Sequence, residues 1–373
     1  MFIIIFPGFE PGWGCFNFDL NTHPAPSHPG KAFFFKENTL KKERTDLRIG
    51  LPSKGRLFDG SMDFLAKAGL SVHKPNPRQY EATIPALPGV VVLFQRVGDI
   101  VVSVEEGSVD FGITGWDTYS ERTLDSDRSL PLLKNLGFGG CTLQVIVPDA
   151  LREVRTIADL AVFRSNLDRP LRVATKFPNL TQRFFEEHGL SDTHVIKSEG
   201  TLEVAPAIGY ADLIVDLVST GTTLRDNHLR MLEDGLMLRS EACLIGNRSA
   251  LKQRPEVMSL AHTLLEFMEA HLRASTTVSV FVNMRGESPD AIADLVFEQD
   301  VIGGLQGPTI SPVLTRENGG WFALHIIVQR RQLSDAIREL RSIGGSGVVV
   351  TPVTYIFEEE PASYRELLEK LED

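Results

Sequence analysis

The segment 211–224 constrains the fold and the chemistry of this chain more than any other stretch. Its sequence is ADLIVDLVSTGTTL, in which an apolar run that contains Asp216 indicates a buried strand. Five small residues follow this run, and four of them carry hydroxyl groups. The five residues are Ser219, Thr220, Gly221, Thr222 and Thr223, and all but Gly221 carry a hydroxyl group. Leu224–Asn227 then has the composition of a helix start, so the segment predicts a strand, a tight turn and a helix.

Such a turn is suited to bind an anion. Backbone N–H groups and the helix dipole point toward a phosphate at this position, and the hydroxyl groups add neutral donors. Gly221 lets the backbone approach the ligand closely, because it has no Cβ atom. Asp216 is placed where a carboxylate could hold sugar hydroxyls beside the phosphate. The alternative is an ordinary turn whose hydroxyls cap the helix, but one hydroxyl is enough for a cap, so five small residues in a row favour phosphate binding.

Predicted strands and helices alternate between residues 47 and 275, which indicates α/β units with mostly parallel sheets. We expect strands at 47–51, 89–94, 109–114, 142–147, 171–174, 195–197 and 213–218, and helices at 61–68, 99–106, 180–188, 204–208 and 255–274. The segment 236–245 is expected to return to the first unit. From residue 276 on, strands at 278–283, 321–328 and 348–355 and helices at 288–298 and 332–343 predict a ferredoxin-like module with a βαββαβ-like order.

The composition limits the possible partners. The chain has 38 basic and 49 acidic residues, and its net charge of −11 argues against a nucleic acid or a membrane as the main partner. Three cysteines that lie far apart in the sequence indicate a reducing compartment, and the nine histidines lack the spacing of a zinc site. We therefore expect a cytoplasmic protein with no metal site built from protein ligands alone.

The N-terminal 46 residues differ from the rest of the chain. Phe2–Phe6 is apolar but is followed at once by Pro7 and Gly8, so it is too short for a secretory signal or a membrane span. Pro, His and Phe are then scattered without periodicity, and a plastid transit peptide would be richer in Ser and Arg. We expect residues 1–46 to be a poorly ordered extension, or to be translated from upstream of the true start.

Residues 199–224 read EGTLEVAPAIGYADLIVDLVSTGTTL, a pattern that closely resembles the signature of ATP phosphoribosyltransferase, the first enzyme of histidine biosynthesis. Four further motifs occur in the order that this family shows: LPSKGRL at 51–57, FQR at 94–96, DFGITG at 110–115 and GFGGC at 137–141. In the tail, GLQGPTISP at 304–312 and IGGSG at 343–347 resemble the regulatory domain of the family's long form. The resemblance extends from about Leu47 to Glu360.

The resemblance implies a bilobal α/β catalytic core with a type II periplasmic-binding-protein-like fold and an active site between the lobes. It also implies a C-terminal ferredoxin-like (ACT-like) regulatory domain. We expect the first catalytic lobe at 47–138 and 228–275. The second lobe, with the phosphoribosyl-binding loop, is expected at 139–227, and the regulatory domain at 276–361.

The reaction implied by the resemblance joins ATP to phosphoribosyl pyrophosphate (PRPP), so the protein would be a pentosyltransferase. The adenine N1 atom attacks C1 of the ribose, pyrophosphate leaves, and phosphoribosyl-ATP forms. This substitution requires the positioning of two anions and the stabilisation of a loosening C–O bond, and it needs no protein nucleophile. Mg²⁺ is expected to bridge the substrate phosphates.

The resemblance also implies residue roles. The turn at 219–223 would hold the 5′-phosphate of PRPP. Asp216 would bind the ribose hydroxyls, and Glu203 would join it or take part in proton transfer near the reacting base. Two cations after the first strand, Lys54 and Arg56, are expected to contact pyrophosphate or triphosphate. Arg96 is expected to be a third such cation. A single lysine or arginine is usually a solvated surface charge. For these three residues, however, the position after predicted strands and the family match favour substrate binding.

Two residues of the predicted cleft have other interpretations. Asp117 either lines the cleft as an ATP contact or is a simple turn or cap residue. Cys141 lies in an apolar, Gly-rich step and is interpreted as a packed thiol rather than a nucleophile.

The C-terminal domain is typical of the long form, which implies histidine as a feedback inhibitor. It also implies a homo-oligomer with dimers as building blocks and a hexameric regulated state. The resemblance places Leu305, Thr309 and Gly347 near the histidine. Short-form members lack this domain and depend on a separate synthetase-like subunit.

Two other classes of protein share some of these features. A ligand-binding protein would have the bilobal pattern but would normally be exported, and no signal peptide is visible. A sensor with inactive lobes would not be expected to retain Lys54, Arg56, Glu203, Asp216 and the hydroxyl-rich turn. Release of pyrophosphate from ATP and PRPP together, but from neither alone, would separate the enzyme from both.

Overall fold

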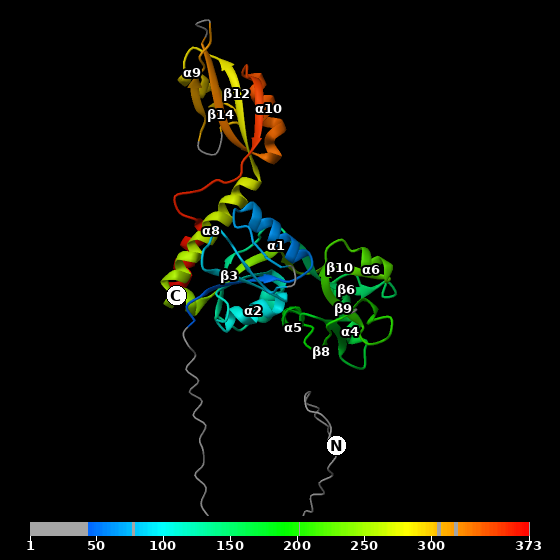
Figure 1. Cartoon of the computed structure of the whole chain (residues 1–373). Coiled ribbons are helices and arrows are strands. Elements are labelled where there is room, and N and C mark those ends of the chain that lie inside the picture. The colour runs from blue at the N-terminus through cyan, green and yellow to red at the C-terminus, as the bar shows by residue number, and fades with distance from the viewer. Residues whose placement is uncertain (1–43, 77–78, 201, 304–306, 317–319, 373) are drawn as a thin grey trace, which may run out of the picture. The chain divides into compact units, whose positions relative to one another are not determined.

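The computed structural model describes residues 44–76, 79–200, 202–303, 307–316 and 320–372 of the 373-residue chain. The extension expected over residues 1–46 therefore lies almost wholly outside the described residues. The part that follows contains three sheets, which we call the sheets of the first lobe, the second lobe and the C-terminal domain (Figure 1).

The first lobe is built on a six-stranded sheet with the order β2-β3-β1-β4-β11-β5. The strands are β1 (Leu47–Pro52), β2 (Glu81–Thr83), β3 (Val90–Gln95), β4 (Phe111–Gly115), β5 (Ser129–Leu133) and β11 (Ala242–Asn247). β1 pairs in parallel with both β3 and β4, so the carboxyl ends of these three strands meet at one edge of the sheet. The helices that follow these ends are α1 (Arg56–Lys67), α2 (Val97–Glu105) and α3 (Trp116–Arg122).

The second lobe, drawn in green in Figure 1, has a five-stranded sheet with the order β10-β6-β9-β7-β8. Its strands are β6 (Cys141–Pro148), β7 (Leu171–Thr175), β8 (Thr193–Lys197), β9 (Leu213–Val218) and β10 (Leu229–Ser240). β7 pairs in parallel with β8 and β9, which brings the carboxyl ends of these three strands together. The helices are α4 (Ile157–Ser165), α5 (Pro178–Glu187) and the short α6 (Thr222–Asp226).

The chain crosses between the lobes twice, between β5 and β6 and between β10 and β11. We expected the return to the first lobe at residue 228, and this boundary is wrong. β10 pairs antiparallel with β6 and belongs to the second lobe, whereas β11 pairs with β4 and β5 of the first lobe. The segment 236–245, which was expected to return to the first unit, contains the end of β10 and most of β11, with Glu241 between them.

The helix expected at 204–208 is also absent. The segment forms a 3-10 turn, Leu202–Val204, followed by further turns. Pro206 has no N–H to continue a helix, and Gly209 adopts a positive φ of 71°. This turn holds Glu203 close to the end of the second-lobe sheet. The expectation of two α/β lobes joined by crossing segments is nevertheless confirmed.

The C-terminal domain has the order β12 (Thr277–Arg285), α9 (Pro289–Phe297), β13 (Thr309–Pro312), β14 (Trp321–Gln329), α10 (Leu333–Ser342) and β15 (Ser346–Pro352). The four strands form an antiparallel sheet with the order β13-β14-β12-β15. This arrangement confirms the predicted ferredoxin-like module. The short strand β13 supplies the second strand of the βαββαβ order, which the sequence pattern had not resolved.

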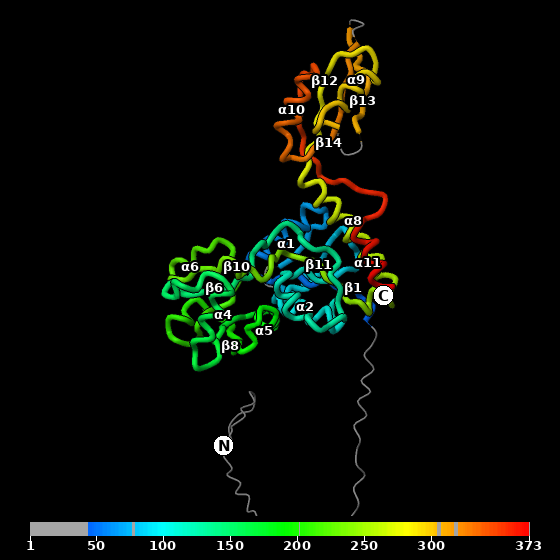
Figure 2. The backbone as a smooth tube through the Cα atoms, turned by 180° about the vertical axis from the view of Figure 1, so that it is seen from behind, coloured from blue at the N-terminus to red at the C-terminus, as the bar shows by residue number. Residues whose placement is uncertain are grey.

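Three more helices belong to the first lobe. They are α7 (Arg248–Gln253), the long α8 (Pro255–Ser275), which leads into β12, and α11 (Ala362–Glu372). Figure 2 shows α11 beside α8, and Leu367 of α11 lies in the same apolar core as Leu264 and Leu265 of α8. The end of the chain therefore returns from the C-terminal domain to the first lobe, which the sequence had not indicated.

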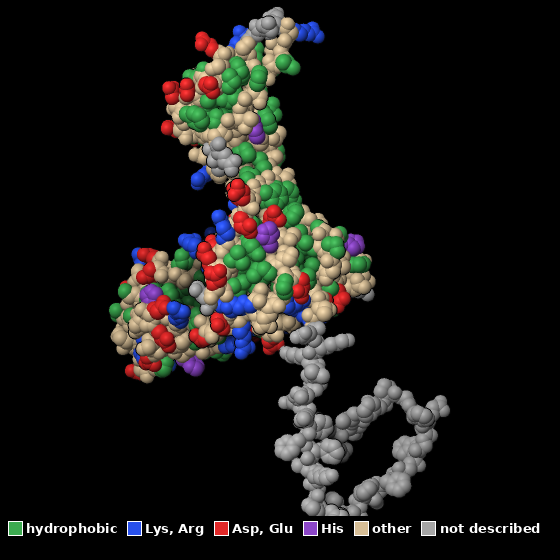
Figure 3. Space-filling model, turned by 90° about the vertical axis from the view of Figure 1, so that its left-hand side faces the viewer, with side chains coloured by type: hydrophobic (Ala, Val, Ile, Leu, Met, Phe, Trp, Pro, Cys, Tyr) green, Lys and Arg blue, Asp and Glu red, His purple; other side chains and the backbone are tan. Residues whose placement is uncertain are grey.

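In the described part of the chain, no helix is both long enough and apolar enough to span a bilayer. On the face shown in Figure 3, acidic and basic side chains are interspersed rather than gathered into one basic patch.

Candidate active site

The predicted phosphate turn lies between β9 and α6. Gly221 adopts the left-handed conformation, with φ 69°, immediately before the first turn of α6. A Cβ atom at this position would meet only Val218, at 3.9 Å, so the backbone conformation rather than space requires a glycine. The side chains of Ser219, Thr220, Thr222 and Thr223 are exposed, and the hydroxyls of Thr220 and Thr222 lie 3.3 Å apart. Because α6 has only five residues, amides and hydroxyls must supply most of the attraction for an anion.

Asp216 lies in β9, three residues before this turn, and is half-buried. Burial raises the pKa of its carboxyl group, and the nearby charge of Glu203 raises it further. The amide N–H of Leu217 and the charge of Lys176 act in the opposite direction. Asp216 and Glu203 are thus brought together, as expected, and Lys176 is a neighbouring cation that we had not predicted.

One cation reaches the turn from the opposite lobe. Arg56, at the start of α1, donates a hydrogen bond of 2.8 Å from Nη2 to Oγ of Ser219. Gly55 precedes it with φ 77°, so the turn after β1 depends on a glycine. The structure therefore joins the first-lobe motif and the second-lobe motif at one place.

Lys54 and Arg96 follow the ends of β1 and β3. The parallel register pairs Pro52 with Gln95, and the amide of Ser53 donates to the carbonyl of Gln95 at 2.8 Å. Both cations thus lie at the same sheet edge as Arg56, and both are exposed. Their contact with a substrate stays a prediction.

Asp117 is buried at the start of α3, with 7% of its surface exposed. Its Oδ2 atom accepts a hydrogen bond of 2.6 Å from Ser240, and its Oδ1 atom accepts one of 2.7 Å from Thr118. Ser240 is the last residue of β10, next to a crossing segment. These contacts fit a residue that anchors the crossing, and an additional contact with ATP stays a prediction.

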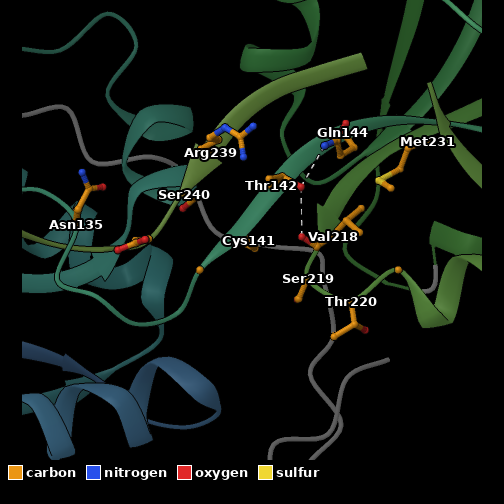
Figure 4. A pocket seen from close by; sticks show the side chains of 13 residues that line it. Asn135, Cys141, Thr142, Gln144, Val218, Ser219, Thr220, Met231, Arg239 and Ser240 are labelled. Atoms are coloured by element: carbon orange, nitrogen blue, oxygen red, sulfur yellow. Dashed lines mark hydrogen bonds between the residues drawn. The ribbon is translucent and has the colours of Figure 1, made fainter. Parts of the chain in front are cut away.

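A cavity of about 710 Å³ lies beside the turn and both crossing segments. Figure 4 shows its lining, with Ser219 and Thr220 on one side and Arg239 and Ser240 on another. Arg239 is a cation that sequence reasoning missed. Cys141 also lines the cavity, and burial raises the pKa of its thiol to about 11, so the thiol is neutral at physiological pH. This agrees with a packed thiol rather than a nucleophile.

The residues predicted to bind the inhibitor histidine are not all brought together within one chain. Leu305 lies outside the described residues. Thr309 begins β13 and lines a cavity of about 530 Å³, together with Arg273, His325 and Glu358. Gly347 lies in β15, at the other edge of the sheet. Three strand spacings separate β13 from β15, which corresponds to about 14 Å.

Among the described residues, no group of three or more His, Cys, Asp or Glu side chains is arranged to hold a metal ion. Asp216 lies three residues before the turn, and Glu203 is near enough to raise the pKa of the Asp216 carboxyl group. Two carboxylates fit the chemistry of Mg²⁺, which commonly takes one or two carboxylates and completes its shell with phosphate oxygens and water.

The chain was compared with known proteins. Residues 96–269 match the family profile described as ATP phosphoribosyltransferase, and residues 274–355 match the profile of the HisG C-terminal domain. ATP phosphoribosyltransferase 1, chloroplastic, of Arabidopsis thaliana is 41% identical over 336 residues, which are 88% of this chain and 82% of the relative. The chain belongs to the ATP phosphoribosyltransferase family.

Two further similarities were found. The ATP phosphoribosyltransferase of Rhodopseudomonas palustris (strain HaA2) is 37% identical over 324 residues, which are 86% of this chain and 96% of the relative. A solved structure, the ATP phosphoribosyl transferase (HisG:HisZ) complex from Thermotoga maritima, contains a chain that is 26% identical. The match covers 60% of the present chain and 98% of the Thermotoga maritima chain, with a TM-score of 0.47.

Membership of the ATP phosphoribosyltransferase family confirms that the protein is a pentosyltransferase of histidine biosynthesis. The match of the C-terminal domain confirms the expected long form with its regulatory domain. The roles of individual residues are not decided by these matches and rest on the geometry described above.

Proposed function

We propose that the protein transfers the phosphoribosyl group of PRPP to N1 of ATP, with release of pyrophosphate. The observation that carries this proposal is the hydroxyl-rich turn at 219–223, which has Asp216 on one side and Arg56 of the other lobe within hydrogen-bond distance of Ser219. This arrangement offers donors for a phosphate, a carboxylate for sugar hydroxyls and a cation from across the cleft.

The turn would hold the 5′-phosphate of PRPP. Asp216 would accept hydrogen bonds from the ribose hydroxyls, since it lies three residues before the turn and its carboxylate is half-buried. Glu203 would lie beside the same sugar or near the reacting adenine. These roles require a ligand in which a phosphate is attached to a sugar, as in a phosphoribosyl donor.

The reaction would then be a substitution at C1 of the ribose. The N1 atom of adenine forms a bond to C1, and the bond from C1 to the pyrophosphate oxygen breaks with both electrons going to pyrophosphate. Lys54, Arg56 and Arg96 would stabilise the charge that develops on the leaving group. Lys176 and Arg239 are further cations placed to attract the substrates. No protein nucleophile is required, which agrees with the neutral thiol of Cys141.

Mg²⁺ would be held mainly by phosphate oxygens of the substrates, with Asp216 and Glu203 as the carboxylates available beside the turn. When bound, the ion would neutralise charge on the pyrophosphate. The remaining contributions come from the chain, which binds the two anions and fixes their relative orientation.

Regulation by histidine would take place in the C-terminal domain. The separation of Thr309 and Gly347 on opposite edges of one sheet supports a pocket completed by a second copy of the chain, in which β13 of one subunit lies near β15 of another. Inhibition would follow if histidine favours one quaternary state, such as the hexamer, over another. We also expect a cytoplasmic location, although the Arabidopsis relative is named chloroplastic.

The test of this function is the release of pyrophosphate. ATP and PRPP together, in the presence of Mg²⁺, should give pyrophosphate and phosphoribosyl-ATP, and neither substrate alone should do so. A binding protein or a sensor with inactive lobes would bind one of these molecules without releasing pyrophosphate. Failure of purified, substrate-binding protein to turn over both substrates would overturn the proposal.

A further inference from the structure

Helix α5 of the second lobe begins without a cap of its own. The residue before it, Phe177, makes no side-chain cap, the first helical residue is Pro178, and the first turn contains no acidic residue. A helix start leaves its first N–H groups without partners inside the helix. In α5, Pro178 has no N–H, and Thr181 donates to the carbonyl of Phe177 at 3.0 Å. The N–H groups of Asn179 and Leu180 therefore need acceptors from elsewhere.

These acceptors come from the first lobe. Oε1 of Glu121 accepts the N–H of Asn179 and Oε2 accepts the N–H of Leu180, each at 2.9 Å. In return, Nδ2 of Asn179 donates to the backbone carbonyl of Glu121 at 3.1 Å. Only 8% of Glu121 is exposed, so water competes little for its carboxylate. We call these three hydrogen bonds the interlobe cap.

Glu121 lies four residues after Asp117 on α3, so the two carboxylates are on the same face of the helix. Asp117 contacts Ser240 at the end of β10, and Glu121 contacts the start of α5, which follows β7. β10 and β7 are three strands apart in the sheet of the second lobe. A contact at a crossing segment alone would leave the lobes free to rotate about it, whereas a second contact farther along the sheet restricts that rotation.

The interlobe cap is next to groups that serve the site. Lys176, two residues before α5, acts electrostatically on Asp216. Glu121 and Asn179 also line a cavity of about 520 Å³ whose walls come from both lobes. Its other charged lining residues are Glu105, Arg122, Lys176, Lys197 and Glu199.

We propose that Glu121 is a positioning residue, which caps α5 from the opposite lobe and thereby holds the lobes in the orientation that the reaction needs. The contribution of Glu121 to the reaction rests on the proposed function. Two substrates that must meet between the lobes bind only to the aligned arrangement. A smaller aligned fraction therefore raises the apparent dissociation constants by the same factor.

The test uses the full-length protein and the variant Glu121→Gln, which keeps the shape of the side chain but removes its charge and replaces one of the two acceptor oxygens by an NH2 donor. Hydrogen exchange of the Asn179 and Leu180 amides should become faster by about tenfold, the order expected for loss of one hydrogen bond to a charged group. This measurement needs no substrate. A matched control is Glu187→Gln on the exposed side of α5, which should exchange like the wild type.

The kinetic measurement separates positioning from a purely structural role. Glu121→Gln should raise the KM for both substrates by about tenfold and leave kcat within about twofold, because saturating substrates hold the lobes together themselves. Asn179→Ala retains both backbone hydrogen bonds and should raise KM much less. A structural role alone would lower the amount of active enzyme, and hence kcat, without a change in KM.

The outcomes are distinct. If the two amides exchange as fast in the wild type as in Glu121→Gln, the interlobe cap does not exist in solution and the inference is overturned. If exchange changes but KM does not, the cap is structural only and the positioning role is wrong. If the wild type releases no pyrophosphate, the proposed function fails, and the exchange measurement alone decides whether the cap is present.

Discussion

Nη2 of Arg56 in the first lobe lies 2.8 Å from Oγ of Ser219 in the second lobe, although the two residues are 163 positions apart in the sequence. A phosphate bound at the turn would therefore lie beside a guanidinium group from across the cleft. Arginine is suited to this task because its planar group can donate two parallel hydrogen bonds to a phosphate. The contact links substrate binding to the relative position of the lobes.

Replacement of Arg56 by alanine should lower kcat/KM by about 10- to 100-fold, since a hydrogen bond to a charged group contributes about 1.5–3 kcal/mol. Arg56→Lys keeps the charge without the planar geometry and should give an intermediate value. Lys67→Ala removes an exposed cation from the same helix, where it pairs with Asp63, and should have no effect. Steady-state kinetics at low salt are the measurement, and unchanged kinetics for Arg56→Ala would assign this residue to the surface.

Asp216→Asn should weaken PRPP binding and at the same time stabilise the folded protein at neutral pH. Burial raises the pKa of Asp216, so the folded protein holds this proton more tightly than the unfolded chain does. Ionisation therefore destabilises the folded state as the pH rises from the unfolded pKa, about 3.9, through the raised pKa. Asparagine removes this effect, and the Tm of the variant should exceed that of the wild type at pH 7.

Thermal unfolding at several pH values and calorimetry with PRPP check this prediction. The difference in Tm should disappear as the pH falls below the unfolded pKa, because Asp216 is then protonated in both states. Asp226→Asn, a substitution of an exposed residue in α6, is the matched control and should change neither the Tm nor the affinity for PRPP. Unchanged PRPP affinity in Asp216→Asn would remove this residue from the proposed donor site.

Gly221→Ala tests whether the backbone conformation of the turn matters. The nearest atom to a new Cβ would be 3.9 Å away, so no clash is expected, but the left-handed conformation should cost about 1–2 kcal/mol. If the turn relaxes to avoid this cost, its amides move away from the phosphate and PRPP affinity falls. Gly200→Ala is the control, because this glycine has no positive φ and open space around it. Equal PRPP affinity in both variants, measured by calorimetry, would show that the turn does not bind the phosphate.

Local sequence patterns predicted the elements that carry the proposed site. The strand, turn and helix around Gly221 were predicted from residues that are neighbours in the sequence, and the cations after β1 and β3 were identified because their motifs are contiguous. Lys176 resembles Lys54 in that it is a cation after a parallel strand, but it was not among the predicted site residues. Arg239 gave no such signal, since it lies near the end of a long edge strand.

Contacts between distant segments could not be predicted in this way. The cap that Glu121 provides to α5 joins residues 58 and 59 positions apart, and the local sequence shows only a helix that lacks its own cap. The return of the chain at Glu241 was misplaced because only this residue separates β10 from β11, so no turn sequence marks the crossing. The C-terminal helix α11 has an apolar face, but its partner, α8, lies about a hundred residues earlier.

The histidine pocket gives the last prediction. Gly347→Leu should reduce inhibition by histidine and leave the uninhibited activity unchanged, because the residue lies in the C-terminal domain and a leucine would fill the space beside β15. Gly347 has a φ of 64°, so any larger residue also strains the backbone. Gly347→Ala introduces this strain with little bulk, since the nearest atom to its Cβ is Nδ2 of Asn283 at 4.0 Å. Alanine should therefore retain most of the inhibition that leucine removes.

Inhibition curves and calorimetric titration with histidine are the measurements, and the oligomeric state should be followed by analytical ultracentrifugation. Because Thr309 and Gly347 lie on opposite edges of the sheet, a pocket that contains both needs two chains. Gly347→Leu should then weaken histidine binding and the histidine-dependent assembly together. Wild-type inhibition in Gly347→Leu would show that histidine binds elsewhere. The cavity lined by Thr309, His325 and Arg273 would then be the next candidate, because it needs only one chain.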